Sequence, residues 1–147
     1  MSRQLTADHG LRLYHAEPFV RASSIRDRVE PDPTRSFGLY LDMRWLPTWP
    51  AEVIEWPDYG IPADRERAAV QIVSAFARAR RGELVEVGCT GGLGRTGTVL
   101  ACMAVLAGEP PASAVDWVRR AYNPAAVETS AQQQWVRWFA DRVSDGS

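Results

Sequence analysis

The stretch LVEVGCTGGLGRTGT, residues 84–98, decides the fold of this chain. Leu84–Val87 is short and rich in β-branched residues, which predicts a buried strand, and the apolar run Thr96–Leu106 predicts a buried helix. The connection between them carries four glycines, which accept positive φ values and let backbone amides approach a ligand closely. The first turn of the helix adds unpartnered N–H groups and the positive end of its dipole. Together these features predict a loop that binds an oxyanion such as phosphate.

Cys89, Arg95 and Thr96 add chemistry to this loop. A thiol at a helix N-terminus near a guanidinium ionises more readily, so Cys89 can attack as a thiolate. Arg95 can make a bidentate contact with two phosphate oxygens. The Thr96 hydroxyl can donate a hydrogen bond to the Cys89 sulfur, which stabilises the thiolate when it leaves. The loop therefore predicts a nucleophile inside an anion-binding site.

The pattern Cys89-x5-Arg95-Thr96 resembles the signature loop of the cysteine-dependent protein tyrosine and dual-specificity phosphatases. Two further segments are similar to that family. Trp56-Pro57-Asp58 resembles its WPD loop, which carries the general acid, and Val127–Gln132 resembles the segment whose glutamine positions the hydrolytic water. The order and spacing of the three segments suit a small, bacterial-type member of the family.

The resemblance implies a role for each matching residue. Cys89 is expected to be the nucleophile, Asp58 the general acid and Gln132 the residue that orients water, while Arg95 binds phosphate and Thr96 supports the thiolate. The phosphate-binding residues implied by the loop are Thr90, Gly91, Gly92, Leu93, Gly94 and Arg95. The implied reaction hydrolyses phosphotyrosine in a protein or peptide, with phosphoserine and phosphothreonine as further substrates. It passes through a phosphocysteine and uses no metal or cofactor.

The residues that flank Asp58 also bear on its chemistry. Pro57 lacks a backbone donor and Gly60 permits unusual dihedral angles, so Trp56–Gly60 is predicted to be a loop from local chemistry alone. Because Trp56 and Tyr59 lie beside Asp58, we expect its carboxyl group to be partly desolvated, which favours the protonated form of a proton donor.

Gly88 departs from the family, whose members usually have a histidine before the cysteine that helps to shape the loop. This difference indicates a first alternative, a catalytically weak pseudophosphatase that binds phosphoprotein without cleaving it. A second alternative is a phosphatase for lipids or other phosphomonoesters on the same fold. The second is less favoured, because phosphoinositide members usually have lysines inside the loop and residues 90–94 have none.

The composition limits the class of protein. With 147 residues, 46% of them hydrophobic, the chain is predicted to form a single domain over residues 1–147. Its net charge of −1 and scattered basic residues argue against nucleic-acid binding. Its two cysteines make no disulfide framework, and His9 and His15 lack the companions of a zinc site. Met1–Gly10 lacks the apolar core of a signal peptide and no run resembles a membrane span, so we expect a cytoplasmic protein. The sequence does not specify an oligomeric state.

The remaining patterns predict the other elements. Further strands are expected at Leu11–Tyr14, Phe37–Met43 and Ala51–Glu55, and further helices at Ala63–Arg81, from Pro111 to Tyr122 and at Thr129–Val143. Residues 26–35 predict a polar loop, and Cys102 is expected to be a small buried helix residue. Pattern and resemblance together predict an α/β fold, a three-layer sandwich with a short, mostly parallel central sheet of four or five strands and helices on both faces. The signature loop then lies at the carboxyl edge of the sheet, where such folds bind ligands.

Overall fold

The computed structural model describes residues 37–43, 47–89 and 94–145 and, before them, the backbone of three short strands. The strands β1 (Leu5–Thr6) and β2 (Arg12–Leu13) form an antiparallel pair, and β2 falls within the predicted strand Leu11–Tyr14. The third, β3 (Val20–Ser24), belongs to the main sheet. Three predictions fall outside the described residues: those for the histidines His9 and His15, for the polar loop at 26–35, and for residues 90–93 of the signature loop.

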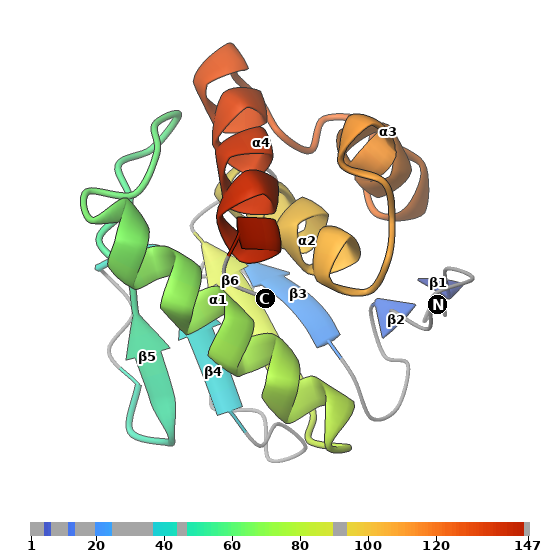
Figure 1. The fold of residues 1–147 in the computed structure, drawn as a ribbon. Coiled ribbons are helices and arrows are strands. Elements are labelled where there is room, and N and C mark those ends of the chain that lie inside the picture. Colours follow the sequence, from blue (N-terminus) through green and yellow to red (C-terminus); the bar gives the residue numbers. More distant parts are fainter. Residues whose placement is uncertain are drawn as a thin grey trace.

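The main sheet has four parallel strands in the order β3-β6-β4-β5 (Figure 1). The strands β4 (Phe37–Tyr40), β5 (Ala51–Val53) and β6 (Val85–Cys89) lie where the sequence predicts them. The strand β3 was missed, because its sequence VRASS has little of the β-branched character of the other strands. It pairs with β6 along its whole length, so tertiary pairing overrides its weak propensity. Since β6 lies between β3 and β4, Cys89 at its end is central on the carboxyl edge.

Helices α1 (Arg65–Arg80), α2 (Gly94–Leu106), α3 (Pro111–Ala121) and α4 (Ser130–Asp145) confirm the predicted helical segments. Helix α1 begins two residues later than predicted, because the Asp64 carboxylate caps it by accepting the Arg67 N–H at 3.1 Å. Gly82 follows α1 with φ of 96° and Gly108 follows α2 with φ of 114°. Both glycines therefore follow their helices with positive φ, a conformation that glycine adopts without a steric cost.

One hydrophobic core joins these helices to one face of the sheet. Phe37 and Leu39 in β4 lie opposite Val85 and Val87 in β6, and all four side chains share a cluster with buried residues of α1, α2, α3 and α4. Helix α2 contacts each of the other helices as well as β6, and Figure 1 shows α1 crossing in front of the sheet. The predicted α/β fold with a short parallel sheet is confirmed, and the described helices share this one face.

Helix α2 is buried from its first residue, which explains its apolar sequence. Every residue from Gly94 to Ala104 is buried, and Cys102 has no exposed surface, as predicted for a small core residue. Burial raises the pKa of the Cys102 thiol well above its usual range, because the surroundings disfavour the charged thiolate. Cys102 is thus a packing residue, whereas Cys89 lies at the sheet edge.

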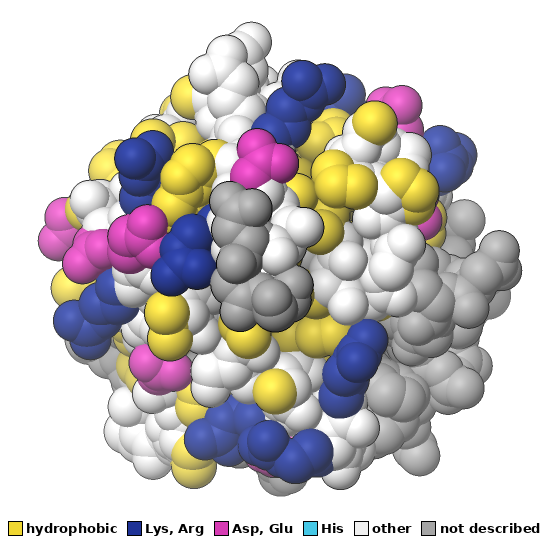
Figure 2. All heavy atoms as spheres, viewed as in Figure 1, with side chains coloured by type: hydrophobic (Ala, Val, Ile, Leu, Met, Phe, Trp, Pro, Cys, Tyr) yellow, Lys and Arg dark blue, Asp and Glu magenta, His cyan; other side chains and the backbone are white. Residues whose placement is uncertain are grey.

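The surface of the molecule mixes charges and apolar groups. On the face seen in Figure 2, most arginine and acidic side chains are interspersed with hydrophobic ones, and one group of dark blue arginine side chains gathers at the lower edge. In α1, Ile72 and Phe76 are buried, while Val73 at the helical spacing beside them is partly exposed. The described helices are all too short or too polar to cross a membrane.

Candidate active site

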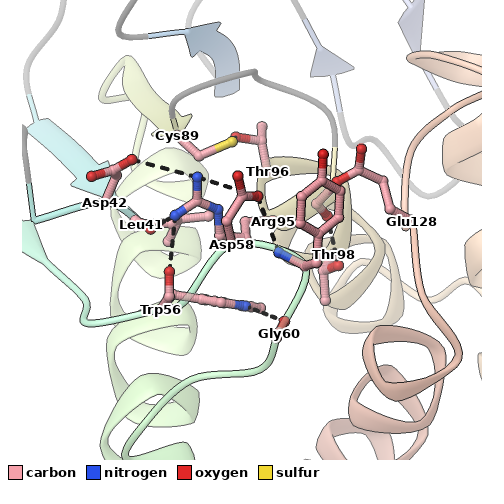
Figure 3. Close-up of polar contacts among 12 residues, drawn as sticks. Leu41, Asp42, Trp56, Asp58, Gly60, Cys89, Arg95, Thr96, Thr98 and Glu128 are labelled. Carbon is pink, nitrogen blue, oxygen red and sulfur yellow. Dashed lines mark hydrogen bonds and ion pairs between the residues drawn. The ribbon is translucent and has the colours of Figure 1, made fainter.

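Cys89 and Thr96 are brought together by the junction of β6 and α2. Cys89 ends the strand and is almost completely buried, while Thr96 lies in the first turn of the helix. The Thr96 hydroxyl donates a hydrogen bond to the Cys89 sulfur over 3.0 Å between Oγ1 and Sγ (Figure 3). This is the contact expected from the sequence spacing, and it gives the sulfur a fixed donor.

The Arg95 guanidinium is held from several sides. Its Nη1 donates to the carbonyl oxygens of Leu41 at 3.0 Å and of Trp56 at 2.9 Å. Its Nη2 lies 3.4 Å from a carboxylate oxygen of Asp42 and 3.6 Å from one of Asp58, so Figure 3 shows it between these two acids. The guanidinium is planar and always charged, so these acceptors together fix its orientation at the carboxyl edge of the sheet.

Asp58 lies in an exposed loop, and the predicted desolvation of its carboxyl group is wrong. Its side chain is 56% exposed, and Oδ1 accepts the backbone N–H of Tyr59 at 3.0 Å as well as facing Arg95. The reason is that Trp56 points into the core instead of over the carboxylate, with its ring 5.3 Å from that of Trp135. The Trp56 indole N–H donates to the Gly60 carbonyl at 2.7 Å, which closes the base of the loop.

Gln132 connects the loop to the segment that precedes α4. Its side chain has no exposed surface; Oε1 accepts the Glu128 N–H at 2.8 Å and Nε2 donates to the Gly60 carbonyl at 3.1 Å. Both ends of the amide are therefore bound to backbone groups. The Gly60 carbonyl accepts from Trp56 and from Gln132, so two buried side chains hold the same point of the loop.

Glu128 is a functional candidate that the sequence analysis missed. Its carboxylate lies directly over Gly94, where any added Cβ atom would collide with it. Burial raises the pKa of Glu128, as does the nearby negative charge of Asp58, while Arg95 opposes the shift. Glu128 thus shares the electrostatic surroundings of Arg95 and Asp58 (Figure 3). The signal was available, since Glu128 begins the Glu-Thr-x-x-Gln motif, but the motif alone does not say which of its polar residues faces the site.

The structure therefore collects Cys89, Arg95, Thr96 and Asp58 at one edge of the sheet, with Glu128 beside them. Of the predicted phosphate-binding residues, Gly94 and Arg95 open α2, and Thr90–Leu93 lie outside the described residues. A sulfur with a hydroxyl donor, a fixed guanidinium and an exposed carboxylate can bind an oxyanion, attack it and exchange a proton with it.

Comparison with known proteins identifies several proteins that are similar in sequence or in structure. The chain is 39% identical over 110 residues to an uncharacterized protein of Methanocaldococcus jannaschii, which covers 65% of this chain and 70% of that protein. It is 32% identical over 85 residues to protein tyrosine phosphatase domain-containing protein 1 of Danio rerio, covering 58% of this chain but only 12% of that protein. Among solved structures, Tk-PTP in its active form superposes with a TM-score of 0.65 at 27% identity, covering 74% of this chain and 80% of that one.

Residues 47–143, more than half of the chain, match the family described as PTP-SAK, Swiss Army Knife protein, DSP-PTPase phosphatase domain. The matched region contains the Asp58 loop, the loop from Cys89 to Arg95 and the Glu128–Gln132 segment. The chain therefore belongs to the protein tyrosine and dual-specificity phosphatase family, as a DSP-PTPase phosphatase domain.

Proposed function

We propose that this chain is a cysteine-dependent protein tyrosine phosphatase, also active on phosphoserine and phosphothreonine, that works through a phosphocysteine. The observation that carries the proposal is the first turn of α2, which supplies a hydroxyl 3.0 Å from the Cys89 sulfur and the guanidinium of Arg95. A nucleophile and an anion-binding group then share one rigid element, which favours attack on a bound phosphate.

In the first step, the Cys89 thiolate attacks phosphorus, so that an S–P bond forms and the P–O ester bond breaks. Arg95 and the backbone amides of Thr90–Arg95 hold the equatorial oxygens, whose negative charge is spread in the transition state. Asp58 gives its proton to the leaving oxygen. Its carboxylate is near Arg95 and open to solvent, so it is accessible to the leaving group of an entering substrate.

In the second step, water attacks the phosphocysteine, an O–P bond forms and the P–S bond breaks. Asp58 takes the proton of the water, and the Thr96 hydroxyl stabilises the departing thiolate through the 3.0 Å hydrogen bond. We assign the orientation of this water to Glu128, which shares the surroundings of Arg95 and Asp58. Gln132, whose amide binds the Glu128 N–H and the Gly60 carbonyl, is assigned the role of holding both segments in place.

The proposal is tested with Cys89→Ser and p-nitrophenyl phosphate, followed by phosphotyrosine, phosphoserine and phosphothreonine peptides. Cys89→Ser should abolish turnover and keep phosphopeptide binding, because the hydroxyl is a poor nucleophile in the same cradle. The matched control is Cys102→Ala, which removes the other, buried cysteine and should leave turnover unchanged. If the parent protein bound phosphopeptides but cleaved none, it would be a pseudophosphatase; if Cys89→Ser kept the parent rate, the mechanism would be wrong.

A further inference from the structure

The backbone before Glu128 has an unusual conformation. Val127 has a φ of 61°, although it is β-branched, and its side chain is 1% exposed. L-residues with branched side chains rarely adopt this left-handed conformation, since Cβ approaches the following carbonyl oxygen. Such a conformation persists only where the surrounding structure holds it. Because Val127 directly precedes Glu128, its conformation affects the direction in which the Glu128 side chain projects from the backbone.

Arg119 of α3 binds this segment from one side. Its Nε donates to the Ala126 carbonyl at 2.9 Å and its Nη2 to the Val127 carbonyl at 2.8 Å. Two successive carbonyls are therefore fixed by one planar group, which sets the orientation of both peptide planes. Lysine has no such fork, because its donors radiate from one nitrogen.

Helix α2 binds the same segment from the other side. A Cβ atom at Gly97 would collide with Ala126 and the Val127 nitrogen, and one at Gly94 would collide with the Glu128 carboxylate. The segment Ala126–Glu128 therefore lies directly on the first turn of α2, the turn that also carries Arg95 and Thr96. Its position is set by two glycines on one side and by Arg119 on the other.

We infer that Arg119 is a positioning residue for Glu128, acting through the left-handed conformation of Val127. Without the guanidinium, Val127 relaxes to a negative φ, the following peptide turns and the carboxylate leaves the site. The hydrogen bond from the Glu128 N–H to Gln132 is then lost as well. This inference rests on the proposed function only for its catalytic consequence, since the position of Glu128 is measurable by itself.

The experiment compares Arg119→Gln with Arg120→Gln, a neighbour in α3 whose side chain is exposed. Arg119→Gln should slow hydrolysis of the phosphocysteine by up to about 100-fold, the loss expected from removing the Glu128 carboxylate itself, because the water is no longer oriented. A burst of p-nitrophenol should therefore precede a slow steady state, and kcat and KM should fall together. Arg120→Gln should behave as the parent protein, and Arg119→Lys should lie between the two.

A double variant distinguishes positioning from general structural damage. If Arg119 acts through Glu128, then Arg119→Gln combined with Glu128→Gln should be no slower than Glu128→Gln alone. The inference would be overturned if the rate losses of the two single variants multiplied in the double variant, or if Arg119→Gln slowed the first step and gave no burst.

A measurement that does not depend on activity follows the Glu128 carboxyl by NMR titration. Its pKa should move toward the ordinary value in Arg119→Gln and stay raised in Arg120→Gln, since the carboxyl then gains solvent and leaves the neighbourhood of Asp58. An unchanged titration in Arg119→Gln would refute the positioning role. If the parent protein had no phosphatase activity, the proposed function would fail, while this titration would still decide the role of Arg119.

Discussion

Two segments far apart in the sequence bring a carboxylate into the electrostatic surroundings of Arg95, and they do so in different ways. Trp56–Gly60 carries Asp58, and Ala126–Gln132 carries Glu128. Each has a residue with positive φ directly beside its acid, Tyr59 at 62° and Val127 at 61°. In the described part of the chain, these are the only residues other than glycine with positive φ. Backbone strain is thus concentrated beside the two acids of the site.

The two segments differ in burial. Tyr59 is 62% exposed and its loop is held at the base, where the Gly60 carbonyl accepts two hydrogen bonds. Val127 is buried and its segment is held along its length by Arg119, Gln132 and the glycines of α2. A segment bound only at its base can adjust to different leaving groups, whereas one bound throughout keeps its group in one place. Both acids are themselves exposed, so the two segments differ in how firmly the backbone beside each acid is held, which suits a mobile proton donor and a fixed group for water.

The largest effect is expected from Asp58→Asn, which keeps the shape of the side chain and removes the proton. The rate of phosphocysteine formation should fall by about 10² to 10⁴, the range of general acid catalysis. Phenyl phosphate should lose more than p-nitrophenyl phosphate, because its leaving group needs the proton more. Single-turnover kinetics measure this step, with the exposed Asp141→Asn as the control. Equal losses for the two substrates would contradict the role of Asp58.

The next effect is expected from Glu128→Gln. Hydrolysis of the phosphocysteine should slow by about 100-fold, at the lower end of the range for general base and positioning groups, and the first step should be unchanged. Pre-steady-state kinetics with p-nitrophenyl phosphate should therefore show a burst that the parent lacks. If the first step slowed instead, the assignments of Asp58 and Glu128 would have to be exchanged.

The same variant should change the pH dependence of stability. Because the native pKa of Glu128 is raised by burial and by Asp58, the native state binds this proton more tightly than the unfolded chain. At a pH above the raised pKa, the charged carboxylate therefore lowers the free energy of unfolding. At a pH below the ordinary carboxyl pKa, the group is protonated in both states and has no such effect. Glu128→Gln should therefore increase the melting temperature relative to the parent at about pH 7 but not at about pH 3. If Glu128→Gln instead lowered the melting temperature at about pH 7, attraction to Arg95 would outweigh the effects of burial and Asp58 on Glu128.

The local part of the site could be predicted from sequence, and the long-range part could not. The contact between Cys89 and Thr96 follows from strand, loop and helix in one short stretch, so spacing alone defines it. The acceptors of Arg95 come from Leu41, Asp42 and Trp56, whose approach depends on the order of strands in the sheet.

The direction in which side chains point relative to the site could not be predicted from the sequence either. The motif Glu-Thr-x-x-Gln identifies the segment, but it does not say that the Gln132 amide is buried and bound to backbone groups while the Glu128 carboxylate lies over Gly94 at the start of α2. The desolvation predicted for Asp58 failed for a similar reason, since adjacency to Trp56 in sequence says nothing of the direction of the indole. Most of the fold could be predicted because apolar periodicity is a property of single segments. The exception is β3, which is defined only by its pairing with β6.

The smallest effect, and the sharpest comparison of the two strained residues, comes from Tyr59→Asn and Val127→Asn. Asparagine tolerates the left-handed conformation better than either native residue, so both variants relieve backbone strain. At the exposed Tyr59 little packing is lost, and the free energy of unfolding should rise by about 0.5 kcal/mol. At the buried Val127 an amide without partners costs about 1 to 3 kcal/mol, which exceeds the relief, so that variant should be less stable. Denaturant unfolding measures both changes, and equal destabilisation would mean that the Tyr59 loop is held as rigidly as the Val127 segment, which would remove the basis for a mobile proton donor.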